Sequence, residues 1–375
     1  MSNFTMQDYE MKLDKQVLHM EQGLSYCPEF RATKMMHDYP SRKVQLARAV
    51  YKNELQANNY ISKILFKSIL SRQGERWQNF GESPEDFTDV MILSRQMMVE
   101  KGCSKELIEG FLKMLEQHQG HLYEVEEELD TAWNRFMPVS SESKTYLMLD
   151  DATYKHVSHS ARSVGEFFKR KNISFYPEIK ATFLGWEYFV YGLVDQGTEH
   201  LRKLIEYLKN KDIDTIITLT GQAQYVLDVF VRKLGLDHDI KVISILDQIE
   251  RLEVEEKVYL YAGSFYTRFL RKENTINDLV INLTEERIKN CAEFTPLLNA
   301  DRRINQVTIW QKPLSAEYAI LGIEPSVLEQ IKSDAISDIK KGTQDRIIAF
   351  EPFAYETLQR HKEVGKVSYY LELIV

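Results

Sequence analysis

The amino-acid sequence predicts an α/β protein in which an all-helical N-terminal domain precedes two tandem α/β repeats with parallel strands. Three observations predict this. Apolar residues recur at helical spacing through residues 1–137. After a polar, serine-rich segment at 137–144, short apolar strands alternate with helices, which is the pattern of parallel β pairing. The stretches at 214–227 and 345–358 also have the same pattern, which is that of a buried strand, a turn and the start of a helix.

The N-terminal domain, expected over 1–137, is built from long amphipathic stretches. Ser83 can cap one of them and Pro84 can occupy its first helical position, with acidic residues in the first turn. The helical patterns lie at 42–70, 83–102 and 105–136. The polar segment that follows is the best linker candidate of the chain.

The two repeats are expected over 145–255 and 256–375. Their period of about 130 residues is too long for a solenoid and indicates a duplicated domain. In the first repeat we expect strands at 144–149, 173–179, 214–219 and 240–245, and helices at 161–172, 198–211 and 222–235. In the second we expect strands at 257–263, 345–350 and 366–373, and helices at 326–342 and 354–361.

Composition narrows the classes of function. A net charge of -8 argues against a nucleic-acid partner, which would require a basic face. The sequence has no apolar window that would cross a membrane, and its N-terminus lacks the apolar run of a signal peptide. Cys27, Cys103 and Cys291 lie far apart, which fits a reducing environment rather than a disulfide framework. A cytoplasmic location is the expectation.

In α/β folds of this kind ligands bind at the carboxyl ends of the parallel strands. The turns Thr220–Ala223 and Glu351–Ala354 are expected at such ends, and so are the Leu-Gly turns at 184–185 and 321–322. Each repeat therefore brings two loops to one end of its sheet.

These four turns resemble the tandem cysteine-rich "CCG" domains of the heterodisulfide reductase family. That family has a Cys-Cys-Gly turn and a downstream Cys-Pro-x-Cys turn in each copy. Phe183-Leu184-Gly185 and Ile320-Leu321-Gly322 stand at the first type of turn. Thr220–Ala223 and Glu351–Ala354 stand at the second.

A further turn of the family, His-Asp-Pro-Cys-His-x-x-Arg, is similar to "LYAGSFYTR" at 260–268, with Ser264 at the cysteine and Arg268 kept. Fused members of the family begin with a helical ferredoxin-like domain that has two C-x-x-C-x-x-C-x-x-x-C-P motifs. Cys27-Pro28 and Ser83-Pro84 resemble the last pairs of these motifs. The preceding ligand places are then Val17, Met20 and Gly23, and Gln73, Arg76 and Asn79.

The departures from the family are as informative as the match. Iron–sulfur clusters require thiolate ligands, and of the eight cubane cysteines that the resemblance implies only Cys27 remains. The resemblance therefore implies a degenerate member from which cluster-based electron transfer is not carried over, and no cofactor is expected. The resemblance identifies a vestigial pocket, formed by Thr220, Ser264, Arg268 and Glu351, and vestigial cluster positions at Cys27 and Ser83. No catalytic residue or metal ligand is assigned.

Three other groups of residues have functional and structural interpretations. His118 with His121, and His156 with His159, have the spacing of a metal site on a helix, but no third ligand has a matching spacing, which favours solvated pairs. Glu351 could be a carboxylate with a raised pKa facing Ser264 or Arg268, or a salt bridge filling the vacated pocket. The aromatic residues near the degenerate second cluster motif are expected to fill volume; they are Trp77, Phe80 and Phe87.

Two functions remain open from the sequence. The first is a cluster-free structural or assembly subunit of a heterodisulfide-reductase-like complex, with flavin- or iron–sulfur-containing subunits as partners and membrane association only through them. The second is a stand-alone protein that uses the vacated pocket for a small molecule or for acid–base chemistry. A subunit should expose an apolar patch, for which the expected source is Met35, Met36, Tyr39, Tyr51 and Tyr60.

Overall fold

The computed structural model describes residues 4–19, 26–73, 86–254, 256, 258–280, 307–314, 325–341 and 345–375. Several positions singled out in the sequence lie outside these residues. They are Met20, Gly23, Arg76, Trp77, Asn79, Phe80, Ser83 with Pro84, Cys291 and Ile320–Gly322.

The N-terminal part of the chain is helical, as the sequence predicts. Local signals place several helix starts: Pro28 and Pro40 occupy first helical positions, and Asn58 caps α4 by accepting a hydrogen bond from the Ile61 N–H at 3.0 Å. The helices are α1 (Glu10–His19), α2 (Pro28–Thr33), α3 (Pro40–Tyr51), α4 (Asn59–Phe66), α5 (Asp86–Glu100), α6 (Lys105–Gln117) and α7 (Glu127–Phe136).

Two small sheets follow, and all of their described strand pairs are parallel, which confirms that part of the prediction. The first has the order β2-β1-β3-β4 and the second the order β5-β6-β7. The strands are β1 (Thr145–Asp150), β2 (Ala181–Thr182), β3 (Thr215–Thr218), β4 (Lys241–Ser244), β5 (Val258–Tyr261), β6 (Arg346–Ala349) and β7 (Lys366–Tyr369). The helices among them are α8 (Asp151–His156), α9 (Ala161–Arg170), α10 (Trp186–Val190), α11 (Val194–Asn210), α12 (Gly221–Gln224), α13 (Val231–Lys233), α14 (Glu273–Asp278), α16 (Pro325–Ile339) and α17 (Pro352–Arg360).

The two sheets repeat the same arrangement. In β1-β3-β4 and in β5-β6-β7 the middle strand is the second of the three in chain order, and a helix follows it directly. The registers correspond as well, because Ile217 pairs with Leu147 and Ile348 pairs with Leu260. The likeness of the stretches at 214–227 and 345–358 therefore reflects the same place in two similar sheets.

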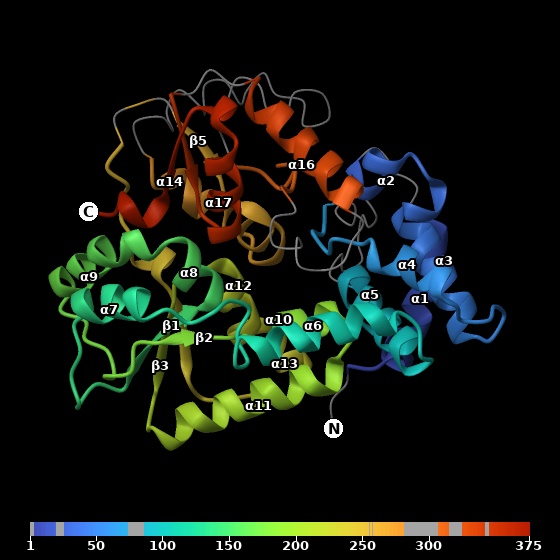
Figure 1. Ribbon diagram of the computed structural model, residues 1–375, viewed down its shortest axis with the longest axis horizontal. Helices are drawn as coiled ribbons and strands as arrows, with labels where there is room; N and C mark the ends of the chain where they lie inside the picture. Colours follow the sequence, from blue (N-terminus) through green and yellow to red (C-terminus); the bar gives the residue numbers. More distant parts are fainter. Residues whose placement is uncertain are drawn as a thin grey trace.

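The carboxyl ends of the two sheets face each other (Figure 1). The helix after the first strand of one repeat packs against the helix after the middle strand of the other. Thus α8 contacts α17, and α12 contacts the π-helical turn Phe265–Phe269. Gly221 makes the second contact close, since a Cβ there would come within 3.1 Å of Phe265 and Tyr266. The two contacts are therefore equivalent in the two repeats.

Several predicted elements differ from the structure. The strand expected at 173–179 is absent; Phe175 forms only an isolated bridge with Val139, because Pro177 lacks the N–H that a ladder requires. The helix expected at 222–235 is interrupted by a π-helical segment, Tyr225–Phe230. The last strand ends at Tyr369 and continues as a 3₁₀ helix rather than extending to residue 373. The long helical patterns at 42–70 and 105–136 are each divided into two helices.

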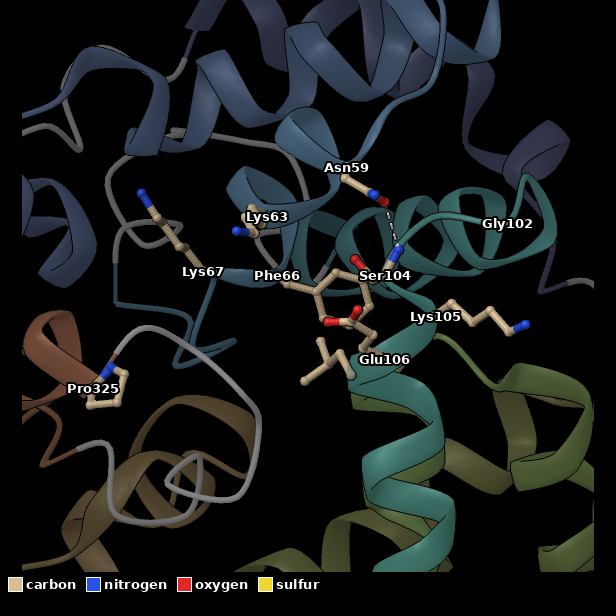
Figure 2. A pocket seen from close by; sticks show the side chains of 10 residues that line it. Asn59, Lys63, Phe66, Lys67, Gly102, Ser104, Lys105, Glu106 and Pro325 are labelled. Atoms are coloured by element: carbon tan, nitrogen blue, oxygen red, sulfur yellow. Dashed lines mark hydrogen bonds between the residues drawn. The ribbon is translucent and has the colours of Figure 1, made fainter.

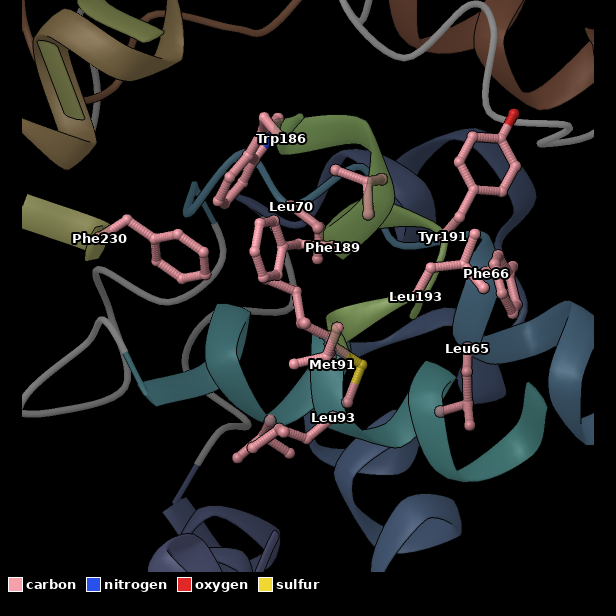
Figure 3. Close-up of a cluster of buried hydrophobic side chains, with 14 of the residues drawn as sticks. Leu65, Phe66, Leu70, Met91, Leu93, Trp186, Phe189, Tyr191, Leu193 and Phe230 are labelled. Atoms are coloured by element: carbon pink, nitrogen blue, oxygen red, sulfur yellow. The ribbon is translucent and has the colours of Figure 1, made fainter. Parts of the chain in front are cut away.

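The N-terminal helices and the first repeat share one apolar core. Figure 3 shows Leu65 and Met91 from the N-terminal helices in the same cluster as Trp186 from α10. The buried Arg95 joins the same parts, because its guanidinium donates to the carbonyl of Leu65 and, at 2.7 Å, to that of Val190. The helical part is therefore packed against the repeat rather than tethered to it.

Candidate functional site at the facing ends of the sheets

The end of the first sheet is closed by a carboxylate and a hydroxyl. Asp150 is the last residue of β1, and it caps α8 by accepting hydrogen bonds from the N–H and hydroxyl of Thr153, at 3.0 and 2.9 Å. Thr220, which follows β3 and caps α12, donates its hydroxyl proton to Asp150 Oδ2 at 2.9 Å. The predicted site residue Thr220 therefore joins two neighbouring strand ends.

The end of the second sheet is closed by Glu351, which follows β6. Its Oε1 accepts a hydrogen bond from the Phe265 N–H at 3.1 Å. The carboxylate lies against Gly263, which has a positive φ of 77°, and a Cβ at that residue would lie 2.0 Å from the carboxyl carbon of Glu351. Glycine is thus required here both for the backbone conformation and for space.

Ser264 and Arg268 lie together beside this turn. The guanidinium donates to Ser264 Oγ at 2.7 Å. It also donates to backbone carbonyls of Ser71, Ile309 and Gln311. Arg268 therefore joins the turn after β5 to the N-terminal part of the chain and to the segment 307–314.

The structure brings the four residues of the predicted pocket to the facing ends of the sheets, but it buries all four of them. Thr220, Ser264, Arg268 and Glu351 are exposed by 2%, 1%, 1% and 5%. Each has hydrogen-bond partners within the protein. These side chains therefore hold the turns in place.

Sequence reasoning missed a cluster of buried carboxylates at the end of the first sheet. Asp150, Asp151 and Glu187 line a cavity of about 10 Å³ together with apolar side chains. This volume has room for about one water molecule. Asp151 accepts hydrogen bonds from His121 Nδ1 at 2.8 Å and from the Leu122 N–H at 2.7 Å. The cavity is too small for a substrate.

Burial dominates the electrostatics of this cluster. Desolvation raises the pKa of Glu187 to about 7, with smaller contributions from the nearby aspartates, while a 3.1 Å hydrogen bond from Gln222 opposes the shift. Burial also raises the pKa of Asp150. The pKa of His121 is raised because its ring donates to Asp151. The sequence signal that could have indicated this carboxylate cluster is the pair of aspartates directly after an apolar strand, in "TYLMLDD" at 145–151.

Replacing Glu187 with glutamine is expected to stabilise the protein at pH 8. Because the folded-state pKa lies above the ordinary value of 4.5, the folded chain keeps a proton that the unfolded chain releases, and stability falls as the pH rises from about 5 to about 7. The difference between the ordinary and the folded-state pKa corresponds to a loss of unfolding free energy on the order of 3 kcal/mol above pH 7. Thermal melting of both proteins from pH 5 to pH 8 measures it. Parallel curves would show that Glu187 does not titrate there.

Several of the ligand positions that the resemblance implies are filled by packed side chains. Leu184 and Ala354, which stand at expected cysteines, are buried, with 4% and 1% exposure. Leu184 belongs to an apolar cluster with Tyr146. Gln73 stands at another ligand place, and its amide donates to the Trp310 carbonyl at 3.0 Å. Phe87 is buried in the core, as expected for an aromatic residue that fills volume.

Cys27 is buried and caps α2. Its thiol donates to Glu29 Oε2, at an Sγ–oxygen distance of 3.0 Å. Burial raises the pKa of Cys27 well above its usual value, and the Glu29 carboxylate adds to the shift. The thiol therefore stays protonated and is a poor metal ligand in this state.

The two histidine pairs do not converge on a common site. His121 is bound to Asp151, whereas His118 Nδ1 lies 3.0 Å from the Leu122 carbonyl oxygen. His156, whose pKa burial lowers to about 4, hydrogen-bonds with Tyr123, while His159 lies 2.8 Å from a carboxylate oxygen of Glu372. Within the described part of the chain no group of three or more His, Cys, Asp and Glu side chains could hold a metal ion.

Comparison with protein-family models, with curated proteins and with solved structures finds no match to this chain. Across the described ranges, no helix has both the length and the apolar character that crossing a bilayer demands.

Proposed function

We propose that the chain is a non-catalytic, cluster-free structural or assembly subunit of a heterodisulfide-reductase-like oxidoreductase or electron-transfer complex. Its partners would be flavin- or iron–sulfur-containing subunits, and its place would be the cytoplasm. The N-terminal helices would keep the arrangement of a ferredoxin-like domain without its clusters. The resemblance of the turns to the family's motifs, and the loss of their cysteines, are the starting points of this proposal.

The observation that carries the proposal is the closed state of the facing sheet ends. At the described turns Leu184 and Ala354 are buried, and Thr220, Ser264 and Glu351 form hydrogen bonds within the protein. In a chain without cluster ligands, whose turns at the sheet ends are buried, the outer surface is the part that can contribute to function, by binding other subunits. Because the four residues of the vacated pocket are buried, the alternative of a small-molecule site there has less support.

Affinity purification of the tagged chain from its native host, with quantitative mass spectrometry, tests the proposal. We expect flavin- or iron–sulfur-containing subunits at a fixed ratio to the chain, and none in a purification from the untagged host. A monomer that is purified alone would contradict it. If that monomer were also stabilised by thiols or small carboxylates in a thermal-shift screen, the alternative would replace it.

A further inference from the structure

A pocket of about 570 Å³ lies apart from the facing sheet ends, between α4, the start of α6 and Pro325 (Figure 2). Phe66, Leu107 and Pro325 contribute apolar groups to its lining. Its volume lies within the range of natural ligand pockets, and a large apolar side chain of another protein would fit.

The surface beside this pocket exposes large apolar side chains. Tyr60, Met36 and Met35 are exposed by 66%, 52% and 50%. Tyr60 lies on α4 three residues before Lys63, so the two share one helix face. The His37 ring packs edge-on against Tyr60, with ring centroids 6.1 Å apart, and brings the methionine segment to the same face.

Two other residues of the expected apolar patch are not exposed in this way. Tyr39 is buried, at 1% exposure, and packs in the core with Val44. Tyr51 is half-buried against the same core. The exposed patch is therefore smaller than the sequence predicts and is centred on Met35, Met36 and Tyr60.

This surface is basic, although the chain carries a net charge of -8. Segments 34–38 and 59–67 contain Lys34, Lys63 and Lys67, and their single acidic residue is Asp38. Asp38 is fully buried and lies 3.4 Å from Lys67 Nζ, so it does not neutralise the two exposed lysines.

Within the described residues of the pocket lining, the charged side chains are Lys63, Lys67, Lys105 and Glu106. Lys67 lies 3.4 Å from Asp38 and Lys105 lies 3.6 Å from Glu109, so Lys63 is the lining lysine that no ion pair between described residues neutralises. We call residues 34–37, Tyr60, Lys63 and the adjoining pocket the basic–apolar surface.

We propose that the basic–apolar surface binds an acidic peptide segment of a partner protein, with an aromatic or large aliphatic side chain of that segment seated in the pocket. This inference rests on the proposed function as a subunit and names one of its docking surfaces. Exposed methionines adapt to varied peptides. Tyrosines act as anchors in interfaces, and exposed lysines select an acidic partner and speed its association.

Two other occupants fit the surface less well. Anionic membranes are bound by clusters of about four to eight basic residues, and segments 34–38 and 59–67 supply three lysines. A small free anion would need several convergent cations in the pocket. However, Figure 2 shows the side chain of Lys105 pointing away from the other labelled residues. Lys67 Nζ lies 3.4 Å from a carboxylate oxygen of Asp38.

Selection of short random peptides displayed on phage, against the full-length chain, tests the inference. We expect enriched sequences with several Asp or Glu residues around one aromatic or large aliphatic residue. A synthetic peptide of the enriched sequence should bind about tenfold more weakly to Lys63→Glu and to Tyr60→Ala. Its affinity should also fall with added salt. The matched control is Lys203→Glu, an exposed lysine on α11, for which no change is expected.

The opposing outcomes are distinct. Failure to enrich acidic peptides, or equal affinity of the selected peptide for wild type and both variants, would overturn the inference. Binding of phosphatidylserine vesicles or inorganic phosphate that is lost in Lys63→Glu, without peptide binding, would assign the surface to a membrane or a small anion instead. None of these results bears on whether redox subunits copurify with the chain, so this inference can fail while the proposed function stands.

Discussion

Replacing Arg268 with methionine is expected to destabilise the protein by about 3–5 kcal/mol. The side chain is 1% exposed, and its guanidinium donates to Ser264 Oγ and to the carbonyls of Ser71, Ile309 and Gln311. Methionine has a similar length but no donor. Each buried acceptor that loses its partner costs about 1–3 kcal/mol, and relaxation of the loops relieves part of the total. Urea unfolding measures the loss.

Two further variants make this test specific. Arg268→Lys should be nearly as unstable, because an ammonium cannot reproduce the planar fork that reaches several carbonyls at once. Arg271→Met, three residues along the chain, removes an exposed guanidinium that pairs with Glu273, and should change stability by less than about 1 kcal/mol. Equal stability of Arg268→Met and wild type would show that the segment 307–314 and Ser71 are not held as described.

Replacing Leu184 with alanine is expected to destabilise the protein by about 2–5 kcal/mol. Leu184 is 4% exposed and packs in a buried cluster with Tyr146, Leu208 and Leu227. Truncation removes apolar contacts and leaves a cavity beside the carboxylates at the end of the first sheet. Thermal and urea unfolding of the variant measure the effect.

Leu112, an exposed leucine on α6, supplies the matched control, since Leu112→Ala removes a side chain that is 39% exposed and should cost far less. If both variants melted at the wild-type temperature, the turn at 183–185 would not be packed and its match to the family's motif would be misplaced. The corresponding position of the second repeat, Leu321, lies outside the described residues.

Much of the fold could be predicted because its strands are short apolar runs with clear boundaries. The middle strands, β3 and β6, begin directly after an aspartate and end before a turn that starts a helix. The absence of a strand at 173–179 could not be predicted from the apolar pattern alone, since one proline outweighs its apolar neighbours in a ladder. The π-helical segment after α12 has no sequence signal that we identify.

The position of the candidate site at the sheet ends could be predicted from the sequence, but the partners and the burial of its side chains could not. Position after a parallel strand identifies Thr220 and Glu351 as residues at a sheet end. Their partners come from other segments: Asp150 from β1 and the Phe265 N–H from the turn after β5. Whether such a polar group faces solvent or closes a turn depends on how the two repeats pack together, which a local pattern does not encode. Glu187 was missed for the same reason.

Iron and acid-labile sulfide analysis of the full-length chain, after anaerobic reconstitution, tests the central claim most directly. The proposed function is that of a cluster-free protein, in which Cys27, the one cysteine at the cluster positions that the resemblance implies, is buried and burial raises the pKa of its thiol. It predicts a colourless protein with no more than a trace of iron and sulfide, and no difference between wild type and Cys27→Ala. A four-iron cluster in stoichiometric amount, lost in Cys27→Ala, would contradict it.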